Sequence, residues 1–564
     1  MRTSRVVALL VAVALGSVLW LLVSRRERVL YVGGPILTMD ATNRVVEALA
    51  VDGERIAAVG TAAELRRWAD EGARVVDLKG RALIPGFIDA HSHFPGAGLS
   101  AVMADLNSPP IGTVRSIGDV VERLREQASR TSGSDWVAGF GYDDSLLTEK
   151  RHPTRTDLDR ASSQHLIAIM HISGHLAAVN SRALEHLGIT RDTPDPDGGR
   201  IRRDAETGEP NGVLEETAAE EVMKRILRPS LLDALKILRR ANELYLAAGV
   251  TTAQNGYASA RDMQTLAWAS RLGGISMRFI LWPNPEATVA LLDGSFTFRS
   301  PDELWVRRGA AKLIADGTIQ GYTGYLGQPY HVPPGDDPGY RGYRRTPRNE
   351  LIERVVRYHT QGWQVAVHGN GDAAIDDILD AFEAAQRAQP RKDARPVIVH
   401  AQMAREDQLD RMQRLGAIPS FFVLHTYYWG DRHRDIFMGP ERAARISPAR
   451  SAVERGMHFT FHADTPVVPM EPLRIVWAAV NRRSTSGAVI GEAQRIEPML
   501  ALRAVTIDAA YQYFEEQEKG SLEAGKLADL VILDRWPLQD PEHIDQIRVL
   551  ETIIGGKTVY RAGS

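Results

Sequence analysis

Two histidines one residue apart, His91 and His93, follow the apolar run Leu83–Ile88. Alternate side chains of a β-strand point to the same face, so both imidazoles could reach one metal ion from the end of a single buried strand. An isolated His-x-His pair is a weak signal, because two polar residues leaving a strand give the same pattern. Its weight depends on whether further metal ligands follow at the ends of later strands.

Later apolar segments carry such residues at or near their ends. His368 and His400 each close one segment. Asp464 follows a third, and Lys312 lies inside a fourth. Imidazole and carboxylate groups are suitable ligands for zinc and related divalent ions. These residues are far apart in the sequence, so they form one site only if the fold brings several strand ends together.

A (β/α)8 barrel has this property, because the C-terminal ends of its strands meet at one face. From about residue 81 to 497, short apolar strands such as Leu166–Met170 alternate with amphipathic helices, for example over residues 231–247, 348–361 and 372–388. Repeated strand–helix units predict an α/β fold with a parallel sheet, and their number favours the closed TIM barrel. An open doubly wound sheet is disfavoured, because no glycine-rich nucleotide loop follows the early strands.

Short strands with turn residues between them occupy both flanks of this region. Val29–Val32 and Ala48–Val51 lie on the N-terminal side, and Asp529–Leu533 and Val549–Ile554 lie on the C-terminal side. We therefore predict a small composite β-sandwich domain built from residues 29–82 and 497–564. Residues 83–496 then form the barrel with its insertions.

Composition excludes several classes of protein. The chain has 564 residues, a formal net charge of -3 and no cysteine. Disulfides, thiolate metal sites and a cysteine nucleophile are therefore absent. No cluster of basic and aromatic residues predicts nucleic-acid binding.

Residues 1–28 differ from the rest of the chain. Val6–Val23 is almost uninterruptedly apolar and has arginines on both sides. As a helix, 18 residues extend roughly 27 Å, just enough to cross a bilayer core. Ala14–Gly16 is a poor cleavage site, so we favour an uncleaved transmembrane anchor over a signal peptide. The expected location is a single-pass membrane protein with a periplasmic or otherwise extracytoplasmic catalytic domain.

The motifs occur in the order found in a known family. The segments that carry the resemblance are Pro85–His93, Lys312–Gly317, His368–Asp372, His400, Asp464–Pro466, Ser173–His175 with Asn180–Leu184, and Gly520–Val531. Together they resemble the metal-dependent amidohydrolase superfamily, and more closely its amidohydrolase-3 branch, which includes deacylases of N-substituted amides and formamides. Each motif is weak alone, whereas the ordered set is specific. The resemblance implies a (β/α)8 barrel beside a composite β-domain.

The resemblance also implies roles for individual residues. His91 and His93 would bind the more buried metal ion, and His368 and His400 would bind a second. Asp464 would ligate metal and transfer the proton during catalysis. Zinc is the expected ion, and the number of ions, one or two, stays open.

Lys312 decides between one and two ions. By resemblance, it stands where binuclear members carry a carbamylated lysine. A lysine buried near cations has a lowered pKa, and the neutral amine can capture CO₂ to form an anionic bridge between two metals. The alternative is a structural ion pair between Lys312 and Asp316, which would favour a single metal.

Further side chains are candidates for substrate binding. His175 could hold the substrate carbonyl or its oxyanion, or could equally be a structural loop residue. The other candidates are Tyr142, Glu215, Tyr322 and His425. His462 shares a strand face with Asp464 if the alternation continues, and Asp372 either orients His368 or caps a helix.

The predicted activity is hydrolysis of a carbon–nitrogen bond in a small-molecule, non-peptide amide by a metal-activated water. Asp464 would accept the proton of the water and help to protonate the departing amine. A homodimer is compatible with this prediction. One alternative is a deaminase or ester/lactone hydrolase with the same metal site. Another is a barrel that has lost catalysis and acts as a binding protein, against which the complete ligand set argues.

Overall fold

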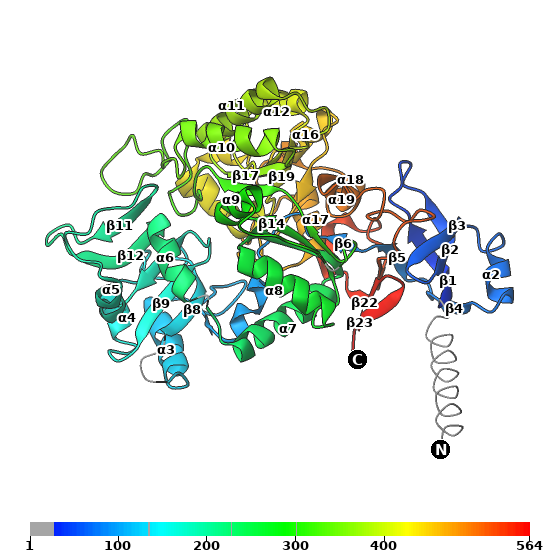
Figure 1. Cartoon of the computed structure of the whole chain (residues 1–564), viewed down its shortest axis with the longest axis horizontal. Coiled ribbons are helices and arrows are strands. Elements are labelled where there is room, and N and C mark those ends of the chain that lie inside the picture. Colours follow the sequence, from blue (N-terminus) through cyan, green and yellow to red (C-terminus); the bar gives the residue numbers. More distant parts are fainter. Residues whose placement is uncertain (1–26, 133–135, 227, 301, 564) are drawn as a thin grey trace, which may run out of the picture.

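The computed structural model describes residues 27–563 apart from 133–135, 227 and 301 (Figure 1). A β-rich region drawn in blue lies at one end of the molecule, and a second β-rich region drawn in cyan lies at the other. Strands and helices from residue 250 to 512 occupy the space between them.

Strands from both flanks of the chain share an eight-stranded sheet with the order β23-β22-β21-β5-β1-β2-β3, in which β4 also pairs with β1. These strands are β1 (Arg28–Leu37), β2 (Val45–Asp52), β3 (Arg55–Gly60), β4 (Arg74–Asp77), β5 (Ala82–Pro85), β21 (Leu530–Leu533), β22 (Val549–Ile554) and β23 (Lys557–Arg561). The antiparallel pair β5–β21 joins the two flanks, with Pro85 opposite Leu530. The exact domain boundaries stay a prediction.

Two parallel sheets form the central part of the molecule. The first has the order β15-β14-β13-β6, and the second runs in chain order from β16 to β20. Their strands are β6 (Phe87–Ile88), β13 (Val250–Ala258), β14 (Arg278–Pro283), β15 (Val306–Arg308), β16 (Ala311–Ile314), β17 (Val365–Gly369), β18 (Val397–His400), β19 (Ile418–Phe421) and β20 (Thr460–Phe461). Most of their residues are buried, as expected for parallel strands covered on both faces.

Backbone hydrogen bonds connect the segments that follow the two outer strands, β6 and β20. The amide of Asp464 donates to the carbonyl of His91 at 3.1 Å, and the amide of His93 donates to the carbonyl of Thr465 at 2.7 Å. The parallel sheets and the helices between their strands confirm an α/β architecture. Closure of the two sheets into one barrel stays a prediction.

Amphipathic helices cover the central sheets. They include α7 (Leu231–Ala247), α8 (Ala260–Arg271), α9 (Pro285–Asp293), α10 (Arg348–Thr360), α11 (Asp372–Ala388) and α12 (Glu406–Leu415). Three of these, α7, α10 and α11, begin and end within one residue of the helices that periodicity predicts. The helical segments that follow are α13 (His425–Tyr428), α14 (Gly430–Arg432), η2 (His433–Phe437), α15 (Pro440–Ala443), α16 (Ala449–Glu454), α17 (Pro472–Asn481), η3 (Glu492–Gln494), α18 (Pro498–Ala504), α19 (Ile507–Gln512) and η4 (Pro541–Gln546).

A six-stranded sheet with the order β11-β12-β10-β9-β8-β7 forms the second β-rich region. It contains β7 (Ala104–Asp105), β8 (Trp136–Tyr142), β9 (Leu166–His171), β10 (Leu176–Val179), β11 (Gly199–Arg203) and β12 (Pro210–Glu216). The helical segments of the N-terminal half are α2 (Arg66–Asp70), η1 (Gly96–Ala101), α3 (Ile117–Ala128), α4 (Arg155–Asp159), α5 (Ser181–Leu187) and α6 (Thr217–Ile226). Leu166–Met170, which we expected in the barrel, belongs to this separate sheet, because β9 pairs with the antiparallel strand β10.

The predicted membrane localisation is contradicted and has to be corrected. The longest helices of the described part, α7 and α11, have 17 residues each and expose charged residues on one face. No helix among residues 27–563 is long and apolar enough to cross a bilayer, which takes about 20 predominantly apolar residues. The predicted transmembrane segment, Val6–Val23, lies outside the described residues.

Candidate metal centre

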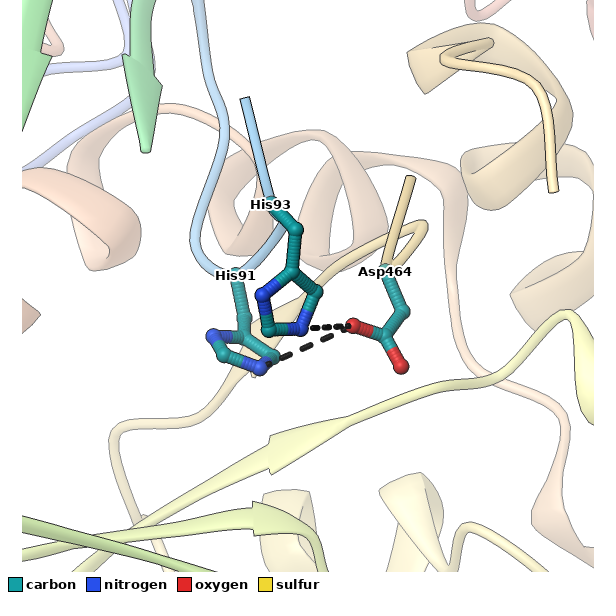
Figure 2. A group of neighbouring side chains, drawn as sticks. All are labelled: His91, His93 and Asp464. Atoms are coloured by element: carbon teal, nitrogen blue, oxygen red, sulfur yellow. Dashed lines mark ion pairs between the residues drawn. The ribbon is translucent and has the colours of Figure 1, made fainter. Parts of the chain in front are cut away.

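Two histidines and an aspartate converge where β6 and β20 end (Figure 2). Nε2 of His93 lies 3.3 Å from Oδ1 of Asp464, and Nε2 of His91 lies 3.6 Å from the same oxygen. His91 is buried, whereas the side chain of His93 is 39% exposed and opens the group to solvent. Three such groups arranged around one point can hold a divalent metal ion.

A second pair of imidazoles, from the ends of β17 and β18, faces the same carboxylate. Nε2 of His400 lies 3.1 Å from Nδ1 of His368 and 3.8 Å from Oδ2 of Asp464. Nε2 of His368 lies 3.1 Å from the carbonyl oxygen of Gly317 and can donate its proton there. Nδ1 of His368 then keeps its lone pair and faces His400, so the two buried nitrogens must share a proton or a cation.

Asp464 connects the two pairs of histidines. Its backbone has a φ of 53°, a left-handed conformation that few aspartates adopt. Burial alone would raise the pKa of its carboxyl group, but the neighbouring histidines outweigh burial and hold this pKa well below its usual range. Oδ1 has no hydrogen-bond donor in suitable geometry among the described residues. An ionised, buried carboxylate with an unused oxygen fits a cation ligand.

Lys312 reaches the same point from β16. Its amine is buried, and Nζ lies 3.1 Å from Nε2 of His91. Burial lowers the pKa of Lys312 to about 7, although the nearby Asp464 acts in the opposite direction. The carboxylate of Asp316 does not pair with this amine. It accepts the backbone N–H groups of Tyr325, Asn370 and Gly371, at 2.9, 3.0 and 2.8 Å, so its role is to hold the loops around the site.

His175 lies beside this group and is held by a residue that the sequence did not reveal. Its ring centroid is 5.0 Å from that of His368, and its Nδ1 is 2.7 Å from Oε2 of Glu216. Burial would raise the pKa of Glu216, but His175 and Arg345 outweigh it and lower the pKa. Glu216 was missed because Glu215 and Glu216 face opposite sides of β12, and the sequence does not say which side meets His175.

The remaining candidates for substrate binding are spread over the surroundings of the centre. Glu215 accepts hydrogen bonds from Arg202 and from the hydroxyl of Tyr343. The hydroxyl of Tyr142 lies 3.2 Å from Nδ1 of His152. These partners lie on β11 (Arg202), in the loop after β16 (Tyr343) and in the loop after β8 (His152).

Tyr322 and His425 belong to aromatic clusters. The Tyr322 ring packs on Tyr330 and Phe437, with centroids 5.0 and 5.1 Å away. His425 begins α13 and packs on Phe422, and its centroid lies 6.3 Å from that of His400. His425 thus lies beside a candidate metal ligand.

His462 lies between the two pairs of histidines, although β20 ends at Phe461 and the alternation that would place it there does not continue to Asp464. Its ring centroid is 5.3 Å from that of His91 and 5.0 Å from that of His400. Burial lowers the pKa of His462 to about 4, so this imidazole is neutral at pH 7. Asp372 makes no comparable approach to His368. It begins α11, where it accepts the amide of Gly327 and pairs with Arg405.

Another group, formed by Asp143, Asp144 and His171 near the end of β8, has the spacing of a metal site, but its carboxylate oxygens already have protein donors. Oδ2 of Asp143 accepts hydrogen bonds from Trp429 and Arg432, and its Oδ1 accepts from Ser145. Asp144 lies 3.1 Å from Nε2 of His171. Because protein donors already fill both oxygens of Asp143, we assign this group to an ion-pair network.

The α/β fold and the convergent histidine, lysine and aspartate side chains define a metal-dependent hydrolase. The sequence pattern of the amidohydrolase family matches residues 74–560, and the chain belongs to that family. It is therefore an amidohydrolase, as the ordered motifs predicted.

Individual proteins support this assignment. The chain is 30% identical over 544 residues to an N-substituted formamide deformylase from Arthrobacter pascens. The aligned region covers 94% of this chain and 98% of the deformylase. Its fold is similar to that of an uncharacterized metal-dependent hydrolase from Pyrococcus horikoshii, with a TM-score of 0.72, 27% identity, and coverage of 92% and 99%. The fold is also similar to that of a second uncharacterized metal-dependent hydrolase, from Pyrococcus furiosus, with a TM-score of 0.69 and 28% identity. That similarity covers 91% of this chain and 100% of the Pyrococcus furiosus chain.

Proposed function

We propose that this protein hydrolyses the carbon–nitrogen bond of a small, non-peptide amide, and that N-substituted formamides are the first substrates to test. The observation that carries the proposal is the convergence of four imidazoles, a buried amine and an ionised carboxylate on one point. Similarity to a formamide deformylase over nearly the whole chain supports the choice of substrate class.

The residues fit a centre for two divalent ions, of which zinc is the expected kind. His91 and His93 would hold one ion and His368 and His400 the other, with Asp464 facing both pairs. A bound divalent metal polarises a carbonyl and lowers the pKa of water from 15.7 towards about 7. Lys312, in its carbamylated form, would supply the negative charge between the two positions.

Asp464 has the position and the charge of a general base. Its pKa is held low, so the carboxylate is ready to accept a proton at neutral pH. Its left-handed backbone and its contacts with His91 and His93 fix the direction of Oδ1. After accepting a proton from the attacking water, the same group can pass it to the departing amine nitrogen.

His175 is proposed to hold the substrate carbonyl next to His368, and Glu216 to hold His175. A carboxylate that is bonded to one ring nitrogen fixes both the orientation and the tautomer of an imidazole. Nδ1 of His175 is committed to Glu216, so Nε2 is the atom left to face the substrate.

The substitution Glu216→Gln is expected to lower kcat/KM roughly 10- to 100-fold, mainly through kcat. This loss is smaller than the 10²–10³ typical of a direct oxyanion donor, because Glu216 acts through His175. Steady-state kinetics with a formamide substrate measure it. Glu215→Gln is the matched comparison on the opposite face of β12, and any effect there should fall on KM. Equal kcat losses in both variants would contradict the proposed role of Glu216.

We further infer that the two parallel sheets are the walls of one (β/α)8 barrel within residues 83–496. The chain order of the strands and the hydrogen bonds between the segments after β6 and β20 support it. The nine strands fill eight positions if β15 and β16, which only Gly309 and Ala310 separate, share one. The domain boundaries, with residues 29–82 and 497–564 in one β-domain, rest on the sheet that both flanks share.

Metal removal tests the proposed function most directly. We expect protein treated with a chelator to lose more than about 99% of its amide hydrolysis, because the water then keeps its unperturbed pKa. Addition of Zn²⁺ should restore activity. Formate and amine release from N-substituted formamides is the readout, beside a panel of N-acyl amines, N-acyl amino acids, cyclic amides, amidines and esters.

The same panel separates the alternatives. Ammonia release from amidines, or a preference for esters and lactones, would favour the deaminase or ester/lactone hydrolase with the same site. Purified protein that holds no divalent metal and hydrolyses nothing in the panel would overturn the proposal.

A further inference from the structure

Gln254, a residue of β13 that no motif singled out, contacts the first histidine of the candidate centre. Its Oε1 lies 2.7 Å from Nδ1 of His91, and both side chains are buried. The ring of His91 also stacks on Trp282, with centroids 5.5 Å apart. The Gln254 amide therefore meets the edge of a ring whose plane is already fixed.

The orientation of the Gln254 amide is defined by its other partners. Its Nε2 donates to the hydroxyl of Tyr513 at 2.8 Å and to the carbonyl of Ala90 at 3.2 Å. Its Oε1 also accepts the backbone amide of Ser92 at 3.1 Å. A carbonyl oxygen only accepts hydrogen bonds, so the flipped amide would set an NH₂ group against the Ser92 N–H and an oxygen against the Ala90 carbonyl.

This orientation determines which nitrogen of His91 carries the proton. Because Oε1 of Gln254 can only accept, Nδ1 of His91 must be the protonated nitrogen. Nε2 therefore presents its lone pair towards Lys312 and Asp464, at 3.1 and 3.6 Å. Metal ligation by histidine requires such an unprotonated nitrogen.

Tyr513 extends this chain of contacts to the C-terminal part of the molecule. It follows α19, and its hydroxyl also lies 2.7 Å from the carbonyl of Asp89. Tyr513, more than 400 positions away in the sequence, thus supports the loop that presents His91.

Space for the His91 ring depends in addition on Gly256, because a side chain there would collide with the ring.

We propose that Gln254, held by Tyr513, is the positioning residue that fixes the tautomer of His91 and thereby sets the affinity of the centre for its first metal ion. This inference rests on the proposed metal centre. Loss of such an outer partner typically costs 10- to 100-fold in metal affinity.

The test is the metal affinity of two substitutions, measured by competition of Zn²⁺ between protein and a chelator. Gln254→Leu should weaken Zn²⁺ binding at the position held by His91 and His93 about 10- to 100-fold. Tyr513→Phe releases the Gln254 amide but keeps the aromatic ring, so it should weaken binding less. Gln254→Glu keeps an acceptor for the Nδ1 proton but sets a second oxygen against the carbonyl of Ala90, so it should keep the native tautomer and bind Zn²⁺ more tightly than Gln254→Leu. Chemical shifts of ¹⁵N-labelled histidine in the metal-free protein report the tautomer independently of activity.

Gln512→Leu is the matched control. Gln512 donates to the same carbonyl, Ala90, at 2.8 Å, but does not contact the His91 ring. We expect its metal affinity to stay within about threefold of the native protein, and thermal melting identifies any variant that fails to fold. Native affinity in Gln254→Leu, with the His91 tautomer unchanged, would overturn this inference. A native protein that binds no Zn²⁺ would instead overturn the proposed function.

Discussion

Asp464→Asn is expected to abolish nearly all hydrolysis, with kcat/KM lower by about 10²- to 10⁴-fold, the usual contribution of a positioned general base. The substitution keeps the size of the side chain and one oxygen near His91 and His93, but removes the negative charge. It also removes the only carboxylate within 4 Å of both His93 and His400 among the described residues. Proton acceptance and metal ligation are therefore both impaired.

Metal analysis separates these two effects. If Asp464→Asn still holds one or two ions per chain while kcat falls, proton transfer is the main loss. If the ions are lost too, ligation contributes. Asp372→Asn is the control, since Asp372 also follows a central strand but is the first residue of α11 and pairs with Arg405. We expect that variant to keep its metal and its kcat within about threefold, and near-native kcat in Asp464→Asn would remove Asp464 from the mechanism.

The sequence was sufficient for features that depend on periodicity and strand direction. Alternating apolar strands and amphipathic helices predicted α7, α10 and α11 and an α/β fold. The two-residue period of a strand does not place His91 and His93, because β6 ends at Ile88 and the segment after it carries both histidines. His368 and His400 could be placed near them because parallel strands end at the same face.

Features that depend on antiparallel register or on buried polar contacts were beyond the sequence. β9 has the same apolar character as a barrel strand, and only its pairing with β10 puts it in the other sheet. The choice between Glu215 and Glu216 required the register of β12 against β10. The membrane assignment relied on a segment outside the described residues, and the described helices gave it no support.

The sequence of β13 contains an indication that Gln254 has a buried polar partner. β13 is buried almost throughout, yet it contains Thr251, Thr252, Gln254 and Asn255. Polar side chains in a buried strand need hydrogen-bond partners, so they mark places where the strand meets other polar groups. The identity of those partners, including His91 and Tyr513, comes only from the tertiary structure.

Lys312→Met is expected to lower the metal content from two ions per chain to one or none, and kcat/KM by at least about 10²-fold, as for loss of one preorganised electrostatic group. Methionine keeps the unbranched apolar stem that β16 buries but cannot form a carbamate. Lys519→Met is a matched control, because Lys519 is also buried but pairs with Glu515, away from the histidines. That control should keep both metals, although it will lose stability.

The pH dependence of metal loading tests the carbamate itself. Burial lowers the pKa of Lys312 to about 7, so about a tenth of the amine is neutral at pH 6 and about nine-tenths at pH 8. Only the neutral amine attacks CO₂; it forms an N–C bond and releases one proton. At the same concentration of dissolved CO₂, Zn²⁺-dependent activation of metal-free protein should therefore be faster at pH 8 than at pH 6. With ¹³C-bicarbonate, a carbamate resonance should be present in the native protein and missing in Lys312→Met. Activation that is independent of bicarbonate, without that resonance, would leave Lys312 as a neutral amine bonded to His91 and would favour a single metal ion.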